Sequence, residues 1–293
     1  MTLGQPSRPA KTLLCTTFSL IAFAANSVLC RLALKGGEID PSSFTAVRLV
    51  AGAVVLAVIL QVTAGKKGKK SRGGWWAALM LFLYAVTFSF AYTSLDTGTG
   101  ALVLFGTVQL TIVLIGYFRG VKLRVLEWSG MIIAFGGLAY LVLPGVKAPS
   151  MIGFMLMAAA GAAWGIYTLS GRESINPLAD TAFNFIRTIP LVIVLVIVAL
   201  QDIQLSAQGI LLAAISGGVA SGIGYTLWYT ALGGLSATES AVVQLAVPVI
   251  AAMGGVIFVS ESLSQRLVIS TVLTLSGILM VTLGQHDHVR LRR

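Results

Sequence analysis

Hydrophobic residues form ten nearly continuous runs along this chain of 293 residues, separated by short breaks rich in polar residues, glycine and proline. An apolar helix needs roughly 20 residues to cross a hydrocarbon core of about 30 Å, and the runs have about that length. We predict crossings near residues 12–34, 41–64, 74–94, 98–118, 124–143, 151–170, 177–200, 207–231, 236–258 and 264–284. The predicted fold class is therefore an all-α integral membrane protein with ten transmembrane helices.

The ten runs divide into two sets of five that share residues in the same order. Phe44 and Arg48 in the second run have the same Phe-x-x-x-Arg spacing as Phe183 and Arg187 in the seventh. Two further pairs of segments match: Tyr92–Leu95 with Tyr229–Leu232, and Val108–Leu110 with Val243–Leu245. These matches predict a duplicated chain, and because each half crosses five times, the second half must be inverted relative to the first.

The predicted repeats span residues 1–145 and 146–293, and inverted repeats of this kind place a substrate site where the halves meet. Composition agrees with a membrane protein, since 57% of the residues are hydrophobic, 10% are charged and the mean hydropathy is +0.92. The expected partners are the lipid bilayer and a small-molecule substrate, and a monomer is compatible with the pattern. Cys15 and Cys30 lie on one run, about 22 Å apart on a straight helix, which excludes a disulfide between them.

Basic residues predict the orientation in the membrane, because short cytoplasmic loops are enriched in Lys and Arg. A cytoplasmic N-terminus places most of them, including the cluster from Lys66 to Lys70, on the cytoplasmic side and leaves only Lys35, Lys147 and Arg266 on the other. We expect a multi-pass protein of the bacterial inner membrane with both termini in the cytoplasm. The net charge of +10 lies in loops and tails without interleaved aromatic residues, so no nucleic-acid partner is expected.

Aromatic and amide side chains recur at mid-membrane depth in equivalent runs of the two halves. Tyr84, Phe88 and Tyr92 follow one another every four residues in the third run, as do Tyr225 and Tyr229 in the eighth. A hydroxyl or amide group in hydrocarbon needs a hydrogen-bond partner, which either a neighbouring helix or a wet cavity supplies. The set as a whole favours a cavity, whose aromatic walls and sparse polar groups suit an amphipathic neutral solute such as an aromatic amino acid. The candidate substrate-binding residues are Asn26, Tyr84, Phe88, Tyr92, Gln109, Trp164, Tyr225, Trp228, Tyr229 and Gln244.

Few charged residues fall inside the runs. Arg48 lies about two turns into the second run from the outer side, and Arg187 lies in the seventh run nearer the cytoplasm. Each either extends to lipid headgroups or places a cation at a mouth of the cavity, where it attracts a carboxylate. Glu239, near the cytoplasmic start of the ninth run, is the third candidate mouth charge. Because we find no titratable group at a central site, facilitated export is favoured over proton coupling.

Glycine and proline mark candidate hinges in the eighth and ninth runs. Gly218, Gly222 and Gly224 have the close spacing that packs helices tightly and also permits bending. Pro248 interrupts the ninth run, because proline cannot continue the hydrogen bonding of a helix. We predict that these four positions act in gating.

The two five-helix halves resemble EamA-type members of the drug/metabolite transporter superfamily. The residues that carry this resemblance are Arg48, Arg187, Trp164-Gly165, Pro248 and Glu261. The chain is most similar to bacterial exporters of aromatic and other neutral amino acids of the YddG kind. The resemblance implies a central cavity lined by crossings one to four and six to nine, with the fifth and tenth at the periphery. The sequence departs from the family pattern at Ala25-Asn26, where Trp-Gly is usual, and at Val113 and Val121, the positions equivalent to Pro248 and Glu261.

We expect an exporter of small amphipathic metabolites, above all aromatic or neutral amino acids, that works by alternating access. Export of cationic aromatic drugs is the main alternative, and a channel is another. An enzyme is not expected, because the chain has no His-Glu-x-x-His, Gly-x-Ser-x-Gly or phosphate-loop motif. His286 and His288 lie together in the basic C-terminal tail, where a chance pair is the simpler interpretation, so no metal or other cofactor is expected.

Overall fold

The computed structural model describes residues 9–63, 72–143, 149–171, 174–235 and 237–290. In these ranges the regular secondary structure is helical, apart from an isolated antiparallel bridge between Ile39 and Leu205. The basic cluster Lys66–Lys70 lies outside the described residues, as do the side chains of His286 and His288.

The predicted crossings are found within a few residues of their expected limits. The first half consists of α1 (Pro9–Lys35), α2 (Pro41–Thr63), α3 (Trp75–Ala91), α4 (Thr97–Phe118) and α5 (Val125–Val142). The second half begins with α6 (Met151–Ser170) and α7 (Pro177–Val198) and ends with α12 (Gln265–Arg290). Between them, the eighth crossing has three parts: α8 (Ala207–Ile215), η1 (Ser216–Ile223) and α9 (Gly224–Leu232). The ninth crossing has two parts: α10 (Ala237–Gln244) and α11 (Ala246–Val259).

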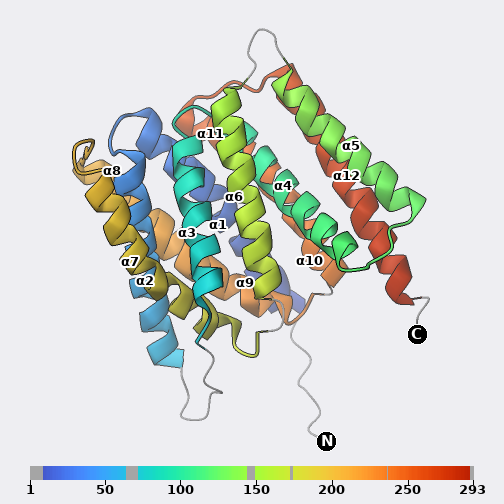
Figure 1. The fold of residues 1–293 in the computed structure, drawn as a ribbon, viewed down its shortest axis with the longest axis horizontal. Helices are drawn as coiled ribbons and strands as arrows, with labels where there is room; N and C mark the ends of the chain where they lie inside the picture. The colour runs from blue at the N-terminus through green and yellow to red at the C-terminus, as the bar shows by residue number, and fades with distance from the viewer. Residues whose placement is uncertain (1–8, 64–71, 144–148, 172–173, 236, 291–293) are drawn as a thin grey trace, which may run out of the picture.

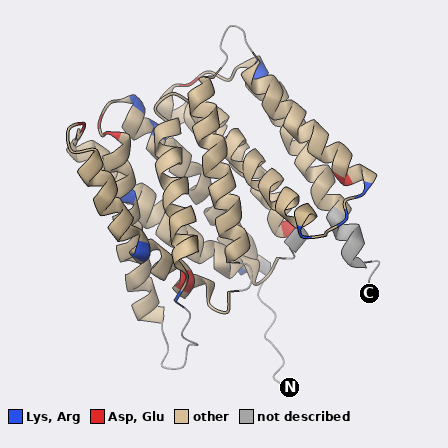
Figure 2. Ribbon diagram, viewed as in Figure 1, with Lys and Arg blue, Asp and Glu red and all other residues tan. Residues whose placement is uncertain are grey.

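Nine of the described helical stretches have the length and hydropathy to cross a membrane, and α3 is a shorter apolar helix of 17 residues. Large apolar side chains face outward along the bundle, among them Val62, Phe118, Ile132 and Ile152. In water so much exposed apolar surface would drive association, whereas in a bilayer it is the expected lipid contact. The charged residues of the described chain lie mainly at the two ends of the bundle, as Figure 2 shows. The protein is therefore an all-α membrane protein.

Polar residues in the breaks accept hydrogen bonds from free backbone groups at the starts of α6, α7 and α8. The Ser150 hydroxyl accepts a hydrogen bond from the backbone of Gly153, and Ser206 accepts one from Gly209. Asn176 caps α7 by accepting from the backbone of Ala179, with Pro177 next to it at a position that needs no N–H donor. These local caps favour the observed starts of α6, α7 and α8, whereas Gly74 and Asp96, before α3 and α4, make no side-chain cap bond.

Helices of the two halves alternate in the packing of the bundle (Figure 1). Helix α3 packs on α6, α2 on α7 and η1, α1 on α9 and α11, and α4 on α6 and α11. Most of these contacts join one repeat to the other. The space between the repeats is therefore surrounded by residues that lie far apart in the sequence.

Helices α5 and α12 pack chiefly against each other at one side of the bundle (Figure 1). Gly130 and Gly277 make this contact close, since a Cβ added to either residue would collide with the carbonyl oxygen of the other. Gly137 faces α12 in the same way, whereas Gly136 points to open space. The family resemblance implies a peripheral position for the fifth and tenth crossings. This position is correct for α5 and for most of α12.

The eighth crossing has a feature that the hydrophobic pattern did not predict. Residues Ser216–Ile223 form the π-helical segment η1 between two α-helical parts. Gly217 lies directly on the backbone of α2, where a Cβ would collide with the carbonyl oxygen of Arg48. Gly218 and Gly222 face Val55 of α2, and Gly224 faces Ala22 of α1. The glycines permit close packing of the eighth crossing on α1 and α2. Because π-helical segments recur at functional sites, a role of these glycines in gating stays a prediction.

The ninth crossing is divided at Leu245. Pro248 has no backbone N–H, so the carbonyl of Gln244, four residues earlier, lacks its usual helical partner. The backbone N–H of Leu245 instead bonds to Val242, three residues before it, and α11 begins at Ala246. The proline predicted as a hinge thus lies immediately after a break in the helix.

Candidate functional site

A cavity of about 1460 Å³ lies between the two repeats. It extends to the end of the bundle where α3, α7 and α10 begin, and Gly73, Ser174 and Leu235 line it there. We call this end the mouth; the charge pattern predicts that it faces the cytoplasm. Asn26, Ser27 and Phe88 line the cavity at the opposite, inner end.

All candidate substrate-binding residues except Tyr92 line this cavity: Asn26, Tyr84, Phe88, Gln109, Trp164, Tyr225, Trp228, Tyr229 and Gln244. Tyr92 is fully buried beyond the inner end, where its hydroxyl donates to the backbone oxygen of Thr97 at 3.3 Å and its ring covers Gly100. The four-residue period correctly placed Tyr92 on the helix face of Tyr84. The turn at the start of α4, however, covers that face two turns further along.

The helices around the cavity differ from the expectation in two places. Helix α2 contributes no lining residue among those described, and it packs instead on α7, η1 and α3. Helix α12, expected at the periphery, does line the cavity near the mouth through Ile278, Val281 and Thr282. This segment of α12 lies beside α10, which brings it to the cavity.

Trp164 occupies the centre of an aromatic wall. Its ring stacks on Tyr167 at 5.1 Å between centroids and on Tyr225 at 5.4 Å, and Tyr84 lies 4.8 Å away. Phe23 extends the wall through contacts of 5.8 Å with both Tyr225 and Trp228. Sequence reasoning missed Phe23 and Tyr167, although Tyr167 follows Trp164 by three residues on the same helix face. The wall joins residues from α1, α3, α6 and the eighth crossing.

A chain of hydrogen bonds at the inner end centres on the hydroxyl of Tyr84. This oxygen accepts from Nη2 of Arg48 at 2.8 Å and from Nδ2 of Asn26 at 3.3 Å. The Oδ1 atom of Asn26 in turn accepts from the hydroxyl of Ser216 in η1. Four separate elements, α1, α2, α3 and η1, are thereby linked around one polar group that lines the cavity.

Arg48 lies in the protein interior, which corrects the prediction of a charge at the cavity mouth or at the lipid headgroups. The residue is only 2% exposed, and its guanidinium lies 4.8 Å from the ring centre of Phe88 and 5.1 Å from that of Tyr84. Its Nη1 atom is buried without a hydrogen-bond partner. The arginine faces α3 rather than lipid, because the buried face of α2 carries it inward.

Arg187, the repeat partner of Arg48, lies near the mouth but does not line the cavity. It donates to the backbone oxygen of Arg72 and lies over the rings of Trp75 and Phe183 at 5.9 and 6.0 Å. Glu239 is exposed in the first turn of α10 and does not line the cavity either. The mouth charges predicted from the sequence are therefore absent from the cavity lining.

Asp180 of α7 is the carboxylate that does line the mouth, and sequence reasoning missed it. Its Oδ1 atom accepts from the backbone N–H of Gly73 at 2.6 Å, and Asn184 accepts from Gly74 at 3.0 Å. These bonds tie the segment before α3 to α7. In the sequence, Asp180 has the position of an ordinary acid in the first turn of a helix, which is common at any helix start, so nothing marked it as a cavity residue.

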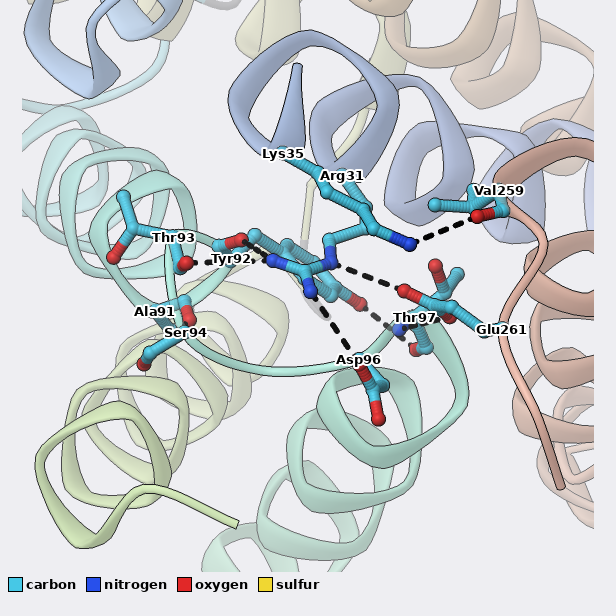
Figure 3. A network of polar contacts seen from close by, with 10 residues as sticks. All are labelled: Arg31, Lys35, Ala91, Tyr92, Thr93, Ser94, Asp96, Thr97, Val259 and Glu261. Atoms are coloured by element: carbon cyan, nitrogen blue, oxygen red, sulfur yellow. Dashed lines mark hydrogen bonds and ion pairs between the residues drawn. The ribbon is translucent and has the colours of Figure 1, made fainter. Parts of the chain in front are cut away.

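A polar network closes the bundle beyond the inner end of the cavity (Figure 3). Arg31 at the end of α1 donates through Nε to Glu261 at 3.0 Å and through Nη1 to the backbone oxygen of Tyr92 at 2.9 Å. Glu261 also accepts from the backbone N–H of Thr97 at 2.8 Å, and Asp96 lies 3.4 Å from Nη2 of Arg31. The network joins α1 to the α3–α4 turn and to the loop after α11, so we call this end of the bundle the closed end.

A second connection at the closed end joins the α1–α2 loop to the segment before α8. The carboxylate of Asp40 accepts from the backbone of Ser42, Ser43 and Gln204, and Ser206 donates to Glu38. Burial alone would raise the pKa of Asp40, but the hydrogen bonds from Ser43, Gln204 and Ser42 outweigh it and hold that pKa below its usual value of 3.8. The charged form of Asp40 therefore stabilises this connection.

Two five-helix repeats around a cavity that reaches one end of the bundle and is closed at the other define a membrane transporter. The chain belongs to the EamA-like transporter family, whose model matches residues 10–143 and 151–283. The match covers each half separately, in agreement with the duplication read from the sequence.

Relatives of known sequence extend over nearly the whole chain. An uncharacterized protein of Pseudomonas aeruginosa is 46% identical over 92% of this chain and 94% of its own length. An uncharacterized transporter of Archaeoglobus fulgidus is 24% identical over 95% of this chain and 99% of its own length. The uncharacterized transporter YoaV of Bacillus subtilis is 20% identical over 86% of this chain and 91% of its own length. A solved crystal structure of 19% identity superposes with a TM-score of 0.62 over 91% of this chain and 98% of that chain, which supports the fold.

Proposed function

We propose that this protein exports small amphipathic metabolites, above all aromatic and other neutral amino acids, across the bacterial inner membrane by alternating access. The observation that carries the proposal is the cavity itself, which combines a continuous aromatic wall around Trp164 with a few amide and hydroxyl groups. A planar apolar side chain would lie against the wall while the polar groups of the substrate meet Asn26, Gln109 and Gln244. The resemblance to exporters of the YddG kind that we expect from the sequence favours the same substrates.

In this proposal the protein alternates between a state open at the mouth and one open at the closed end. The structure has the features of the first state, since the cavity reaches the mouth and the Arg31 network lies beyond its inner end. Opening would require α1, α4 and the loop after α11 to separate. The π-helical segment η1 and the break at Leu245 are the places where the second repeat would bend.

The proposed energy source is the gradient of the substrate. Among the described residues that line the cavity, the acidic one is Asp180 at the mouth, which is engaged in holding the segment before α3. A proton-coupled carrier would place such a group at the centre of the cavity, where it meets the substrate. Export with both termini in the cytoplasm makes the mouth the entry side.

Purified protein in liposomes loaded with radiolabelled phenylalanine, threonine or a cationic aromatic drug provides the test. We expect saturable efflux of phenylalanine that unlabelled phenylalanine on the opposite side accelerates. Trp164→Ala and Gln244→Ala should each reduce this efflux, because they remove the centre of the wall and a lining amide. Trp128→Ala is the matched control, since Trp128 lies on α5 away from the cavity.

The outcomes separate the proposal from its rivals. Efflux of the drug without efflux of either amino acid would favour the multidrug alternative, which rests on the same aromatic wall. Flux that does not saturate and shows no acceleration from the opposite side would indicate a channel. If Tyr84, Trp164 and Gln244 can all be changed to Ala without altering flux or selectivity, the cavity is not the transport site.

A further inference from the structure

Arg48 is a buried cation whose side chain has no ion-pair partner among the described residues. It lies about 10 Å along α2 from the start of that helix, well inside the apolar part of the bundle. Two aromatic rings and one hydroxyl surround it, and its Nη1 atom makes no hydrogen bond. A charge in such surroundings is costly, so an anion beside it would stabilise it, and the residues that the structure describes supply none.

The contacts of Tyr84 direct this positive charge toward the cavity. A phenolic oxygen has one proton to donate and lone pairs with which to accept. The Tyr84 oxygen accepts from Arg48 and from Asn26, so its proton is left for a further acceptor, and no contact in the described part of the chain takes it. Tyr84 and Asn26 both line the cavity. A hydroxyl that accepts from a cation is polarised and becomes a stronger donor.

We propose that Tyr84, backed by Arg48 and positioned by Asn26, forms a carboxylate-binding subsite at the inner end of the cavity. The substrate carboxylate accepts the hydroxyl hydrogen bond of Tyr84, and the Arg48 charge behind the ring stabilises it through the low-dielectric wall. This inference rests on the proposed function and names its substrate class: aromatic compounds that carry a carboxylate, as zwitterions or anions. Cationic aromatic compounds are repelled.

The neighbouring wall fits the rest of such a molecule. Trp164 lies 4.8 Å from the Tyr84 ring and continues into Tyr225 and Tyr167, so an aromatic side chain attached to the bound carboxylate lies beside stacking surfaces. The carboxylate is thereby held at the closed inner end and the apolar part toward the middle of the cavity.

The subsite occurs once, in spite of the internal repeat. Tyr84 corresponds to Ser221 in the second half, by the same alignment that pairs Tyr92 with Tyr229. Arg187, the partner of Arg48, instead bonds to the backbone of Arg72 near the mouth. The two halves therefore share an arginine position, but only the first half presents its charge to the cavity through a tyrosine.

Three probes that share a phenyl ring test the inference: 3-phenylpropionate, which is an anion, phenylalanine, which is a zwitterion, and phenethylamine, which is a cation. Each is measured as a competitor of radiolabelled phenylalanine efflux from proteoliposomes. We expect 3-phenylpropionate to compete at least about tenfold better than phenethylamine, the ratio expected for one charge-assisted hydrogen bond. Arg48→Gln and Tyr84→Phe should each abolish this preference, and Arg48→Lys should restore part of it.

Arg266→Gln is the matched control, because it removes an arginine charge at the closed end, far from the cavity lining. It should leave the ratio of the two competitors unchanged. Tyr84→Phe keeps the aromatic ring, so it tests the hydroxyl even if Arg48→Gln fails to fold. The subsite is overturned if phenylalanine efflux is present and 3-phenylpropionate and phenethylamine compete in the same ratio in wild type, Arg48→Gln and Tyr84→Phe. The proposed function remains intact in that case. If wild type shows no efflux of radiolabelled phenylalanine, the proposed function fails and the subsite with it.

Discussion

Removing the negative charge of Glu261 should loosen the closed end of the bundle. Glu261 is 7% exposed and accepts two hydrogen bonds, from Nε of Arg31 at 3.0 Å and from the backbone N–H of Thr97 at 2.8 Å. In Glu261→Gln one of the two bonds keeps its acceptor but loses the negative charge on it, and the oxygen of the other bond becomes an NH2 group that faces a donor. Charge-assisted bonds exceed neutral ones by about 1 kcal/mol each, and a buried donor without an acceptor costs about 1–3 kcal/mol.

The combined loss is about 2–4 kcal/mol, which raises the ratio of open to closed states roughly 30- to 1000-fold if the open state makes neither bond. Asp96→Asn is the matched control. Asp96 is 59% exposed and lies 3.4 Å from Arg31, so its charge contributes about 1 kcal/mol or less and shifts the ratio by about fivefold at most.

A cysteine below the network measures the opening. Ser27 lines the inner end of the cavity, and Ser27→Cys can be placed in a chain whose buried native cysteines, Cys15 and Cys30, are replaced by alanine. A membrane-impermeant maleimide added at the closed end should label Cys at position 27 much faster in the Glu261→Gln background than in the Asp96→Asn background. Equal labelling rates in the two backgrounds, with both proteins folded, would refute the assignment of Glu261 to closure.

Three further outcomes follow from the contacts of single residues. Gly217→Ala should destabilise the protein by about 1–3 kcal/mol, because the new Cβ meets the backbone of Arg48. Gly136→Ala should leave the stability unchanged, because its Cβ points to open space, and thermal unfolding in detergent compares the two variants. Asp40→Asn should lower the melting temperature at pH 7. Because the folded-state pKa of Asp40 is depressed, the difference in melting temperature from wild type should close as the pH falls below about 3.8. A difference that stays constant from pH 7 to below pH 3.8 would contradict this role of the Asp40 charge. Pro248→Ala restores the N–H that the Gln244 carbonyl lacks, so it should keep or raise the melting temperature while slowing phenylalanine efflux; unchanged efflux would remove the hinge role.

Sequence reasoning succeeded where a property belongs to one segment at a time. Each crossing was found because bilayer thickness sets the length of every apolar run independently of its neighbours. The duplication was visible because equivalent residues, such as Arg48 and Arg187, kept their spacing.

The same reasoning failed where the surroundings of a residue come from other helices. Tyr84 and Tyr92 share a face of α3, yet one lines the cavity and the other is sealed beneath the start of α4. Arg48 has the sequence position of a headgroup arginine, but the buried face of α2 turns it toward Phe88. Asp180 is an ordinary first-turn acid in the sequence and becomes a cavity residue only through the segment before α3.

The sequence by itself determined that this chain crosses the membrane ten times in two related halves, because lipid imposes the same requirement on every crossing: length, apolarity and internally satisfied backbone bonds. It also determined which side chains were available to build a site. Only the tertiary structure decided which of them meet. The closed end joins Arg31 to Glu261, 230 positions apart, and the hydroxyl of Tyr84 gathers donors from α1 and α2. Such meetings depend on how the inverted halves pack, and no periodicity within one helix encodes which neighbour covers its face.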